Sequence, residues 1–205
     1  MINIICFGDS ITAGSEFPVA ARWTSLLQNK LDTAKAGVFT VHNKGIGGDT
    51  TANGFDRLGS DVLTLLPGVV LIQFGFNDAN INSFSEQPRV SLAEFERNIR
   101  EFCRIIIENN SMPVLIVNHS IGNIDGKQGN GKTFNENAIP YSRIIRELAK
   151  ENKVNVIDIP LQMSIRNIAT QDFVAGDQIH LALNANPHYA DIIYQGLNDL
   201  VLPEK

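Results

Sequence analysis

The sequence has no long hydrophobic run and little positive charge. Its longest apolar runs, 69–72 and 114–117, have the length of strands and fall far short of the roughly 18 residues that cross a bilayer. Lysine and arginine together number 17 against 22 aspartates and glutamates, so the formal net charge is −5. No block of basic residues could follow a phosphate backbone. We therefore expect no membrane span and no nucleic-acid partner.

Cysteine is also scarce. Cys6 and Cys103 lie in an apolar strand pattern and an apolar helical pattern, where a free thiol usually behaves as a small buried hydrophobe. The length of 205 residues is enough to bury a core but short for two domains of ordinary size. We expect both cysteines in the core of a single domain spanning residues 1–205.

The amino-terminal residues lack the features of a signal peptide. Residues 1–8 contain neither a basic segment nor a small-residue cleavage site, and they lead directly into a motif. This start predicts a first strand and favours a cytoplasmic location. A chain from which a signal peptide had been removed would begin in the same way.

Short apolar runs alternate with longer helical patterns along the chain. The runs are 2–7, 38–42, 69–74, 114–118 and 154–157, and the helical patterns lie in 23–31, 55–65, 95–106, 144–148 and 187–202. Most runs lack polar alternation, which is typical of strands buried on both faces. The alternation predicts an α/β protein with a parallel sheet. Residues 120–137, rich in glycine and asparagine, predict a long loop.

The first strand is followed at once by Gly8, Asp9 and Ser10. Ser10 is therefore expected on a strand-to-helix turn at the sheet edge where α/β proteins bind ligands. Ser10 could equally cap the helix. The chain contains no Gly-x-Ser-x-Gly, so a nucleophile elbow is not supported. A serine nucleophile would need a histidine base oriented by a third group.

One of the four histidines has a suitable carboxylate nearby. Asp177 precedes His180 by three residues in an irregular segment, and such a turn can fold back so that the carboxylate meets the ring. Asp177 could instead serve an ordinary turn or a cap. His42 and His119 end predicted strands, which favours structural roles, and His188 follows a proline at a helix start.

Ester hydrolysis also needs donors for the oxyanion of the tetrahedral intermediate. The segment 43–50 places glycines after the second predicted strand, and Asn77 places a carboxamide after the third. Each has a plain alternative, since glycines serve turns, Asp49 can cap a helix, and Asn77 or Asp78 can form an Asx-turn.

Four motifs occur in a fixed order from Gly8 to His180. They are Gly-Asp-Ser-Ile-Thr-x-Gly, Asn-x-Gly-x-x-Gly-Asp-Thr, Gly-x-Asn-Asp and Asp-x-x-His. Together they resemble the GDSL (SGNH) hydrolase family. This resemblance implies Ser10 as the nucleophile and His180 as the general base, paired with Asp177. It implies neither a metal nor an organic cofactor.

The resemblance also implies the supporting groups of the site. The oxyanion hole would consist of the Ser10 and Gly48 amides with the Asn77 side chain, and Asp9 would order the turn without taking part in chemistry. Many relatives have a serine where this chain has Gly47, and a Gly-His or Gly-Tyr pair where it has 187–189. These departures leave open the choice between Gly47 and Gly48, and a contact of His188 with substrate.

Pattern and resemblance together predict a three-layer α/β/α sandwich around a five-stranded parallel sheet of flavodoxin-like type. The predicted function is a serine esterase that cleaves a small-molecule ester through an acyl-Ser10 intermediate. The polar loop 120–137 favours a short acyl group, such as an acetyl group on a carbohydrate. The alternatives are a lipid hydrolase of lysophospholipase or thioesterase type, and a non-catalytic binding module on the same fold. No feature of the sequence indicates an oligomeric state.

Overall fold

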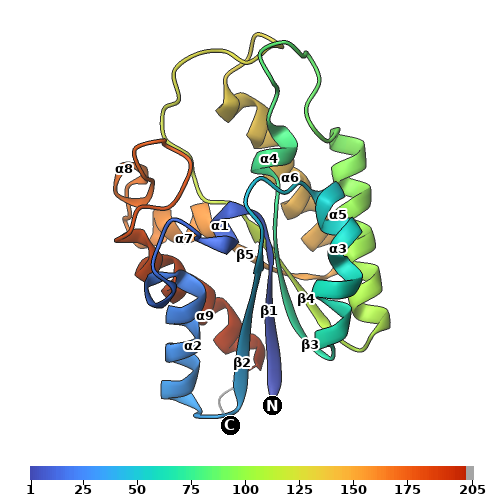
Figure 1. Ribbon diagram of the computed structural model, residues 1–205, viewed down its shortest axis with the longest axis vertical. Helices are drawn as coiled ribbons and strands as arrows, with labels where there is room; N and C mark the ends of the chain where they lie inside the picture. The colour runs from blue at the N-terminus through green and yellow to red at the C-terminus, as the bar shows by residue number, and fades with distance from the viewer. Residues whose placement is uncertain (202–205) are drawn as a thin grey trace.

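The chain folds around a five-stranded parallel sheet. The computed structural model describes residues 1–201. The strands are β1 (Ile2–Gly8), β2 (Phe39–Gly45), β3 (Gly68–Gln73), β4 (Met112–Val117) and β5 (Asn155–Asp158), in the spatial order β2-β1-β3-β4-β5 (Figure 1). This is the flavodoxin-like order, with all neighbours parallel. The predicted sheet and its five strands are confirmed.

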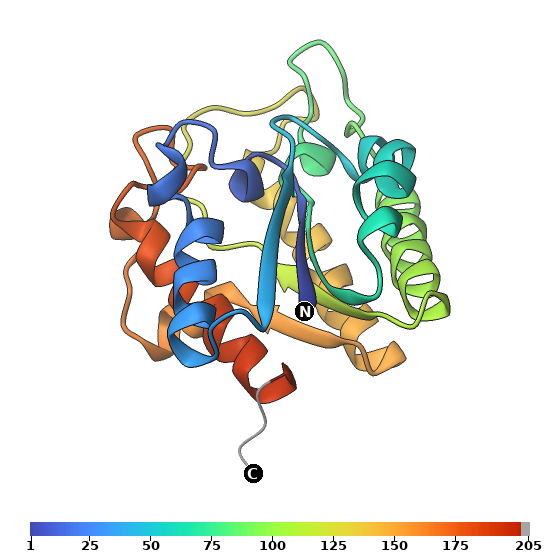
Figure 2. The same ribbon diagram turned by 60° about the horizontal axis from the view of Figure 1, so that its bottom comes forward.

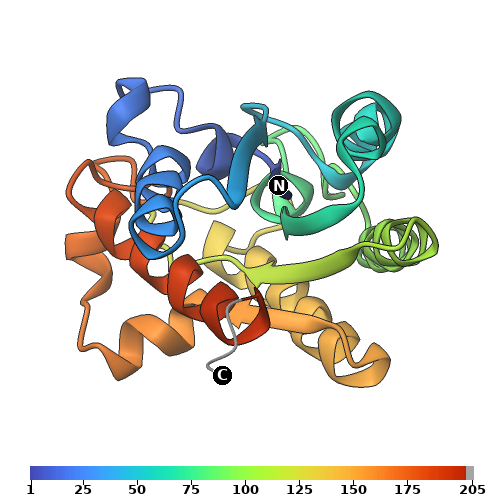
Figure 3. The ribbon, with the colours of Figure 1, turned by 90° about the horizontal axis from the view of Figure 1, so that it is seen from below.

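Helices cover both faces of the sheet. They are α1 (Ser10–Ala13), α2 (Trp23–Ala34), α3 (Thr51–Asp61), α4 (Phe76–Ala79), α5 (Leu92–Glu108), α6 (Phe134–Asn152), α7 (Ile159–Ile165), α8 (Thr170–Phe173) and α9 (Ala185–Val201), with 3₁₀ turns η1 (Val19–Ala21) and η2 (Leu63–Leu65). Helices α2 and α9 pack together on one face, and α3, α5 and α6 cover the other (Figures 2 and 3). Leu202, the last residue of the predicted closing helix, lies outside the described residues.

The core follows the predicted apolar patterns except at Ile2, Phe55 and Val156, which are exposed. Four side chains of α5 are completely buried: Phe95, Ile99, Phe102 and Ile106. Both cysteines are buried, as predicted. Phe55 was expected in the buried stripe of its helix but is 44 % exposed, and its ring stacks on Phe102 at a centroid distance of 5.9 Å. Within residues 1–201, no helix combines the length and the apolar character needed to cross a bilayer.

The predicted loop 120–137 is shorter than expected, because α6 begins at Phe134. Thr133 and Glu136 form a capping box: the Thr133 amide donates to the Glu136 carboxylate over 2.7 Å, and the Glu136 amide donates to the Thr133 hydroxyl over 3.3 Å. This arrangement satisfies two backbone donors at the helix start. The prediction that the loop extends to Asn137 was therefore wrong, and Asn137 lies on the first turns of the helix.

Two glycines allow α1 to lie directly on the ends of β1 and β2. A Cβ atom at Gly45 would lie 2.2 Å from the backbone nitrogen of Ala13, and one at Gly8 would lie 2.3 Å from the Thr12 hydroxyl. Neither position has room for a side chain. The sheet edge therefore holds the four residues of α1, and with them Ser10, at the closest possible approach.

Side-chain hydrogen bonds fix α1 in this place. The Asn43 amide donates to the Thr12 carbonyl over 2.9 Å, and the Trp23 indole donates to the Ile11 carbonyl over 2.8 Å. Trp23 is fully buried. A helix of one turn is not stable by itself, so these tertiary contacts determine where Ser10 lies.

We expect Gly45→Ala to lower both the melting temperature and the activity, because the methyl group would collide with backbone atoms that cannot move without shifting α1. Gly59→Ala is the matched control: Gly59 lies inside α3 with open space around its Cα. Alanine there should stabilise the protein by roughly 0.5–1 kcal/mol through helix propensity. Thermal melting measures the loss of stability in Gly45→Ala and the gain in Gly59→Ala. Equal shifts in the two melting temperatures would contradict the collision expected at Gly45.

Candidate active site

Ser10, His180 and Asp177 form one hydrogen-bonded chain at the carboxyl edge of the sheet. Ser10 Oγ lies 2.8 Å from His180 Nε2, and His180 Nδ1 lies 2.5 Å from Asp177 Oδ2. The other carboxylate oxygen accepts from the backbone amides of Ile179 and His180, over 3.0 and 2.9 Å. The short spacing from Asp177 to His180 thus forms a turn in which the carboxylate faces the ring.

The electrostatics of this chain keep Asp177 ionised. Partial burial raises the pKa of Asp177, but the hydrogen bonds from the His180 ring and from the two backbone amides outweigh this effect, and the net result is a pKa below the ordinary value. An ionised carboxylate accepts a hydrogen bond from Nδ1–H and so keeps the proton of the neutral ring on that nitrogen. His180 Nε2 then presents its lone pair to the Ser10 hydroxyl.

The segment that carries His180 is pinned to the loop after β4. The Gly122 amide donates to the Gln178 carbonyl over 2.8 Å, and His119 Nε2 lies 2.7 Å from the Ile179 carbonyl. Burial lowers the pKa of His119 to about 4, so its ring is neutral and Nε2 donates. His119 is thus a buried group that holds the backbone at Ile179, next to His180.

Asp9 caps α1, so Ser10 is not the capping residue. One Asp9 oxygen accepts from the Ile11 amide over 2.9 Å, while the other is buried without a partner in the described structure. Burial raises the pKa of this carboxyl to about 7, against the lowering effect of the hydrogen bond from Ile11. A titrating carboxyl therefore lies directly beside Ser10 in the chain.

The two oxyanion donors expected besides Ser10 differ in their position relative to the cavity. Asn77 is half-buried, lines the same cavity as Ser10 and His180, and donates from Nδ2 to the Asp49 carbonyl over 3.0 Å. Gly48 is exposed with φ +82° in the loop between β2 and α3, and the lining of that cavity, as described, does not include it. The Asn77 bond to Asp49 nevertheless ties the two segments together.

Asp49 and Asp78 hold these loops in different ways. Asp49 does not cap α3, since Thr50 takes that position, with Asn53 completing a capping box. Asp78 is buried on α4 and accepts from the amide and the hydroxyl of Thr51, over 2.9 and 2.5 Å. Burial raises the pKa of Asp78 to about 6, partly offset by these bonds. This carboxyl joins the start of α3 to α4 and so to Asn77.

Arg57 on α3 binds the same loops and was missed in the sequence. Its guanidinium donates to the Asp49 carboxylate over 2.7 Å and to the Asp61 carboxylate over 2.8 Å. It also donates to the carbonyls of Lys44 and Gly8, each over 2.8 Å. The side chain is 13 % exposed. No spacing rule could have shown that one arginine joins the ends of β1 and β2 to the residue after Gly48.

A cavity of about 300 Å³ is lined by Ser10, Asn77 and His180. Its apolar lining residues are Phe76, Ile124, Phe134 and Ile179, and its polar lining residues include Asn80, Asp125, Lys127 and Gln128. The loop after β4 therefore lines the cavity, as its predicted functional role requires. His188 is exposed on α9 and is not part of the lining that the structure describes.

Gln128 fastens this loop. Its Nε2 donates to the Asn80 side chain over 2.7 Å, and its Oε1 accepts from the Ile81 amide over 3.3 Å and from the Asn137 side chain over 2.7 Å. A Cβ atom at Gly129 would lie 1.9 Å from the Ser85 carbonyl oxygen. The wall of the cavity is thus docked on residues 80–85.

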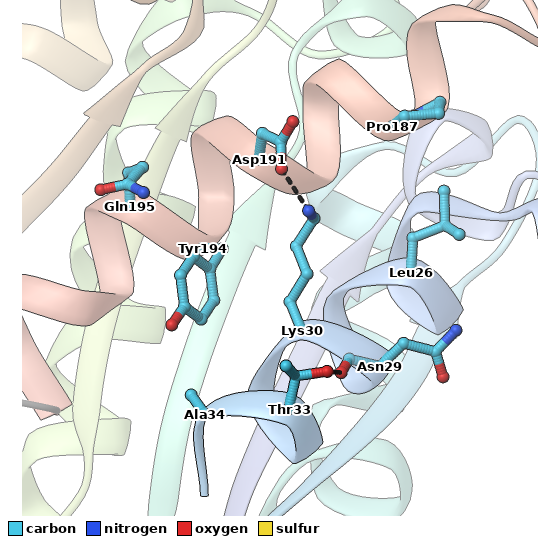
Figure 4. Close-up of a pocket in the computed structure, with 9 residues that line it drawn as sticks. All are labelled: Leu26, Asn29, Lys30, Thr33, Ala34, Pro187, Asp191, Tyr194 and Gln195. Carbon is cyan, nitrogen blue, oxygen red and sulfur yellow. Dashed lines mark hydrogen bonds and ion pairs between the residues drawn. The ribbon is translucent and has the colours of Figure 1, made fainter.

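A larger cavity, of about 520 Å³, lies between α2 and α9 (Figure 4). The Lys30–Asp191 ion pair crosses it, and its described lining contains neither serine nor histidine nor cysteine. Cavity size therefore does not identify the reactive site. In the described part of the chain, no group of three or more His, Cys, Asp or Glu side chains is placed to hold a metal ion.

Comparison with known proteins gives a family and several relatives. The model of the GDSL-like lipase/acylhydrolase family matches residues 6–184. The chain is 29 % identical to the lipoprotein YqeF of Bacillus subtilis, over 96 % of this chain and 88 % of the relative. It is 28 % identical to thioesterase 1/protease 1/lysophospholipase L1 of Escherichia coli, over 97 % and 85 %. The solved acetyl xylan esterase AlAXEase superposes with a TM-score of 0.79 at 25 % identity, covering 96 % of this chain and 100 % of the other.

We expect Asp9→Asn to stabilise the protein more as the pH rises. Because the pKa of Asp9 is raised to about 7, the folded state binds this proton more tightly than the unfolded state. The wild type therefore loses stability as the pH rises from about 4 to 7. Asparagine keeps the bond to Ile11 without titrating. Thermal melting at pH 4.5, 6 and 7.5 should show a difference in melting temperature between the two proteins that grows with pH. A difference that does not change with pH would contradict the raised pKa of Asp9.

Proposed function

The chain belongs to the GDSL-like lipase/acylhydrolase family, and from that premise we propose that it hydrolyses a small ester through an acyl intermediate on Ser10. The family and the relatives make it an ester-hydrolysing enzyme. The observation that carries the finer proposal is the unbroken hydrogen-bonded chain from Asp177 through His180 to Ser10 Oγ. This chain contains a nucleophile, a base and an orienting carboxylate.

In the first step His180 Nε2 takes the hydroxyl proton of Ser10 while Oγ attacks the ester carbonyl carbon. The tetrahedral intermediate then releases the alcohol, which receives the proton from His180, and the acyl group stays on Ser10. In the second step His180 takes a proton from water, whose oxygen attacks the acyl carbon. The acid leaves, and the proton returns to Ser10. Asp177 stabilises the imidazolium in both steps.

The oxyanion would be bound by the amides of Ser10 and Gly48 and by the side chain of Asn77. A carboxamide has two N–H donors, and Asn77 uses one of them on the Asp49 carbonyl. The second is free to face the cavity. The Asp49 bond thus supports an oxyanion role for Asn77, since it fixes the orientation of the amide plane.

A short acyl group on a hydrophilic alcohol is the substrate that the cavity favours. Its volume of about 300 Å³ is at the lower end for pockets that enclose small molecules. Its lining combines apolar and polar side chains, which suits an acyl group and a hydroxylated partner. The name of the acetyl xylan esterase AlAXEase points to an acetylated carbohydrate. The name of the Escherichia coli relative keeps a lysophospholipid or thioester as the second candidate.

Two further expectations from the sequence stay predictions. Residues 1–205 are expected to form a single domain. A cytoplasmic location is the second prediction, and one relative is named as a lipoprotein.

Ser10→Ala should abolish turnover of p-nitrophenyl acetate, because no nucleophile would remain. A fluorophosphonate should add once to the wild type, and His180→Ala should lose this label, since only an activated serine reacts. His188→Ala is the matched control, and it should keep both turnover and label because His188 is exposed outside the cavity. Intact-mass spectrometry measures the adduct. A wild type that neither reacts nor turns over esters would favour a binding module.

Arg57→Lys should lower kcat by roughly 10- to 100-fold with little change in KM, less than the loss of an entire oxyanion donor. Lysine keeps the charge but cannot bind four acceptors at once. The Gly48–Asp49 loop and Asn77 would then be held less firmly. Arg104→Lys, on the exposed surface of α5, should leave kcat unchanged. If the two variants have equal kcat and KM values, Arg57 has no role in positioning the site.

A further inference from the structure

A second cavity of about 280 Å³ adjoins the catalytic cavity. The two share one lining residue, Phe76. Apolar side chains of the second cavity come from Ile121, Ala138 and Ile139, and Ser142 lies beside them on α6. Nothing in the proposed reaction uses this space.

The same segments of chain border both cavities. Ile124 and Phe134 line the catalytic cavity, whereas Ile121 and Asn135, on the same loop and the same helix turn, line the second. The two spaces therefore lie back to back between the loop after β4 and the start of α6. Phe76 stands at their boundary.

The ring of Phe76 is a fixed part of this boundary. Phe76 is 6 % exposed, its ring meets the His119 ring edge-on at 5.3 Å, and it lies 6.1 Å from the Phe134 ring. The backbone of α4 is closed by the Ala79 amide, which donates to the Gly75 carbonyl over 2.9 Å. Close packing on two sides prevents the ring from turning out of the way.

We propose that Phe76 is a specificity-determining residue that restricts the enzyme to short acyl groups by closing the catalytic cavity against the second one. This inference rests on the proposed esterase function. Removing the ring would join the two spaces and roughly double the volume open to an acyl chain. The apolar side chains of Ile121, Ala138 and Ile139 would then contact a hydrocarbon chain of medium length.

The test compares kcat/KM for p-nitrophenyl acetate, butyrate and octanoate in the wild type and in Phe76→Ala. The wild type should prefer acetate or butyrate. In Phe76→Ala the octanoate-to-acetate ratio should rise by at least about tenfold, because even one methylene in an apolar pocket changes kcat/KM by about that factor. Phe76→Leu should give a smaller rise.

A matched variant shows whether the acyl chain of the substrate enters the second cavity. Ser142 is half-buried in its lining, on α6 and away from Ser10. Phe76→Ala combined with Ser142→Phe should refill the cavity and return the ratio toward the wild-type value. Thermal melting and acetate turnover establish that each variant is folded.

An unchanged ratio in a folded, acetate-active Phe76→Ala would overturn the inference, as would a wild type that already prefers octanoate. If the wild type cleaves none of these esters, the proposed function has failed, and octanoate binding decides the role of Phe76 separately. Isothermal titration of octanoate in the Ser10→Ala background should then show binding to Ser10→Ala/Phe76→Ala and at least tenfold weaker binding to Ser10→Ala alone. Equal affinities would overturn the inference.

Discussion

The close contact between α1 and the ends of β1 and β2 is the constraint on which the site depends. Gly8 and Gly45 leave no room for a side chain, so α1 has one position. A chain of buried polar groups joins this helix to the rest of the sheet: the Thr12 hydroxyl donates to Gln73 over 2.7 Å, and Gln73 donates to Asn118 over 2.8 Å. Buried polar groups are costly without partners, and these groups satisfy one another only when α1 is in place.

One part of the site is positioned by tertiary contacts and the other by contacts within a single turn. Ser10 is placed by tertiary contacts that reach β2, β3 and α2, whereas Asp177 and His180 orient each other within one turn. Arg57 belongs to the first part, since it binds the carbonyls at the ends of β1 and β2 together with Asp49. The cost of burying its charge is offset by two carboxylates and two carbonyls, which explains how an arginine 13 % exposed is tolerated here.

The three inner strands β1, β3 and β4 were predictable because a run buried on both faces needs apolar residues almost throughout. Asp177 could be paired with His180 because their contact is local. The start of α6 was missed although Thr133 and Glu136 have the spacing of a capping box, since the glycine-rich context outweighed it. The roles of Arg57 and Phe76 could not be predicted, because each depends on tertiary placement. Phe76 follows Gly75, whose φ is +128°, and two of the four partners of Arg57 are backbone carbonyls, which no residue type in the sequence marks.

The hydrogen bond between Ser10 and His180 joins residues that are 170 positions apart. Every strand pairing in the sheet is parallel, so each of them also spans a long stretch of chain, and contacts of this kind form late and slowly in folding. During synthesis from the ribosome, Ser10 emerges early and His180 emerges late. The contact between Ser10 and His180 therefore forms only after almost the whole polypeptide has been made and has folded, and a nascent or truncated chain lacks it.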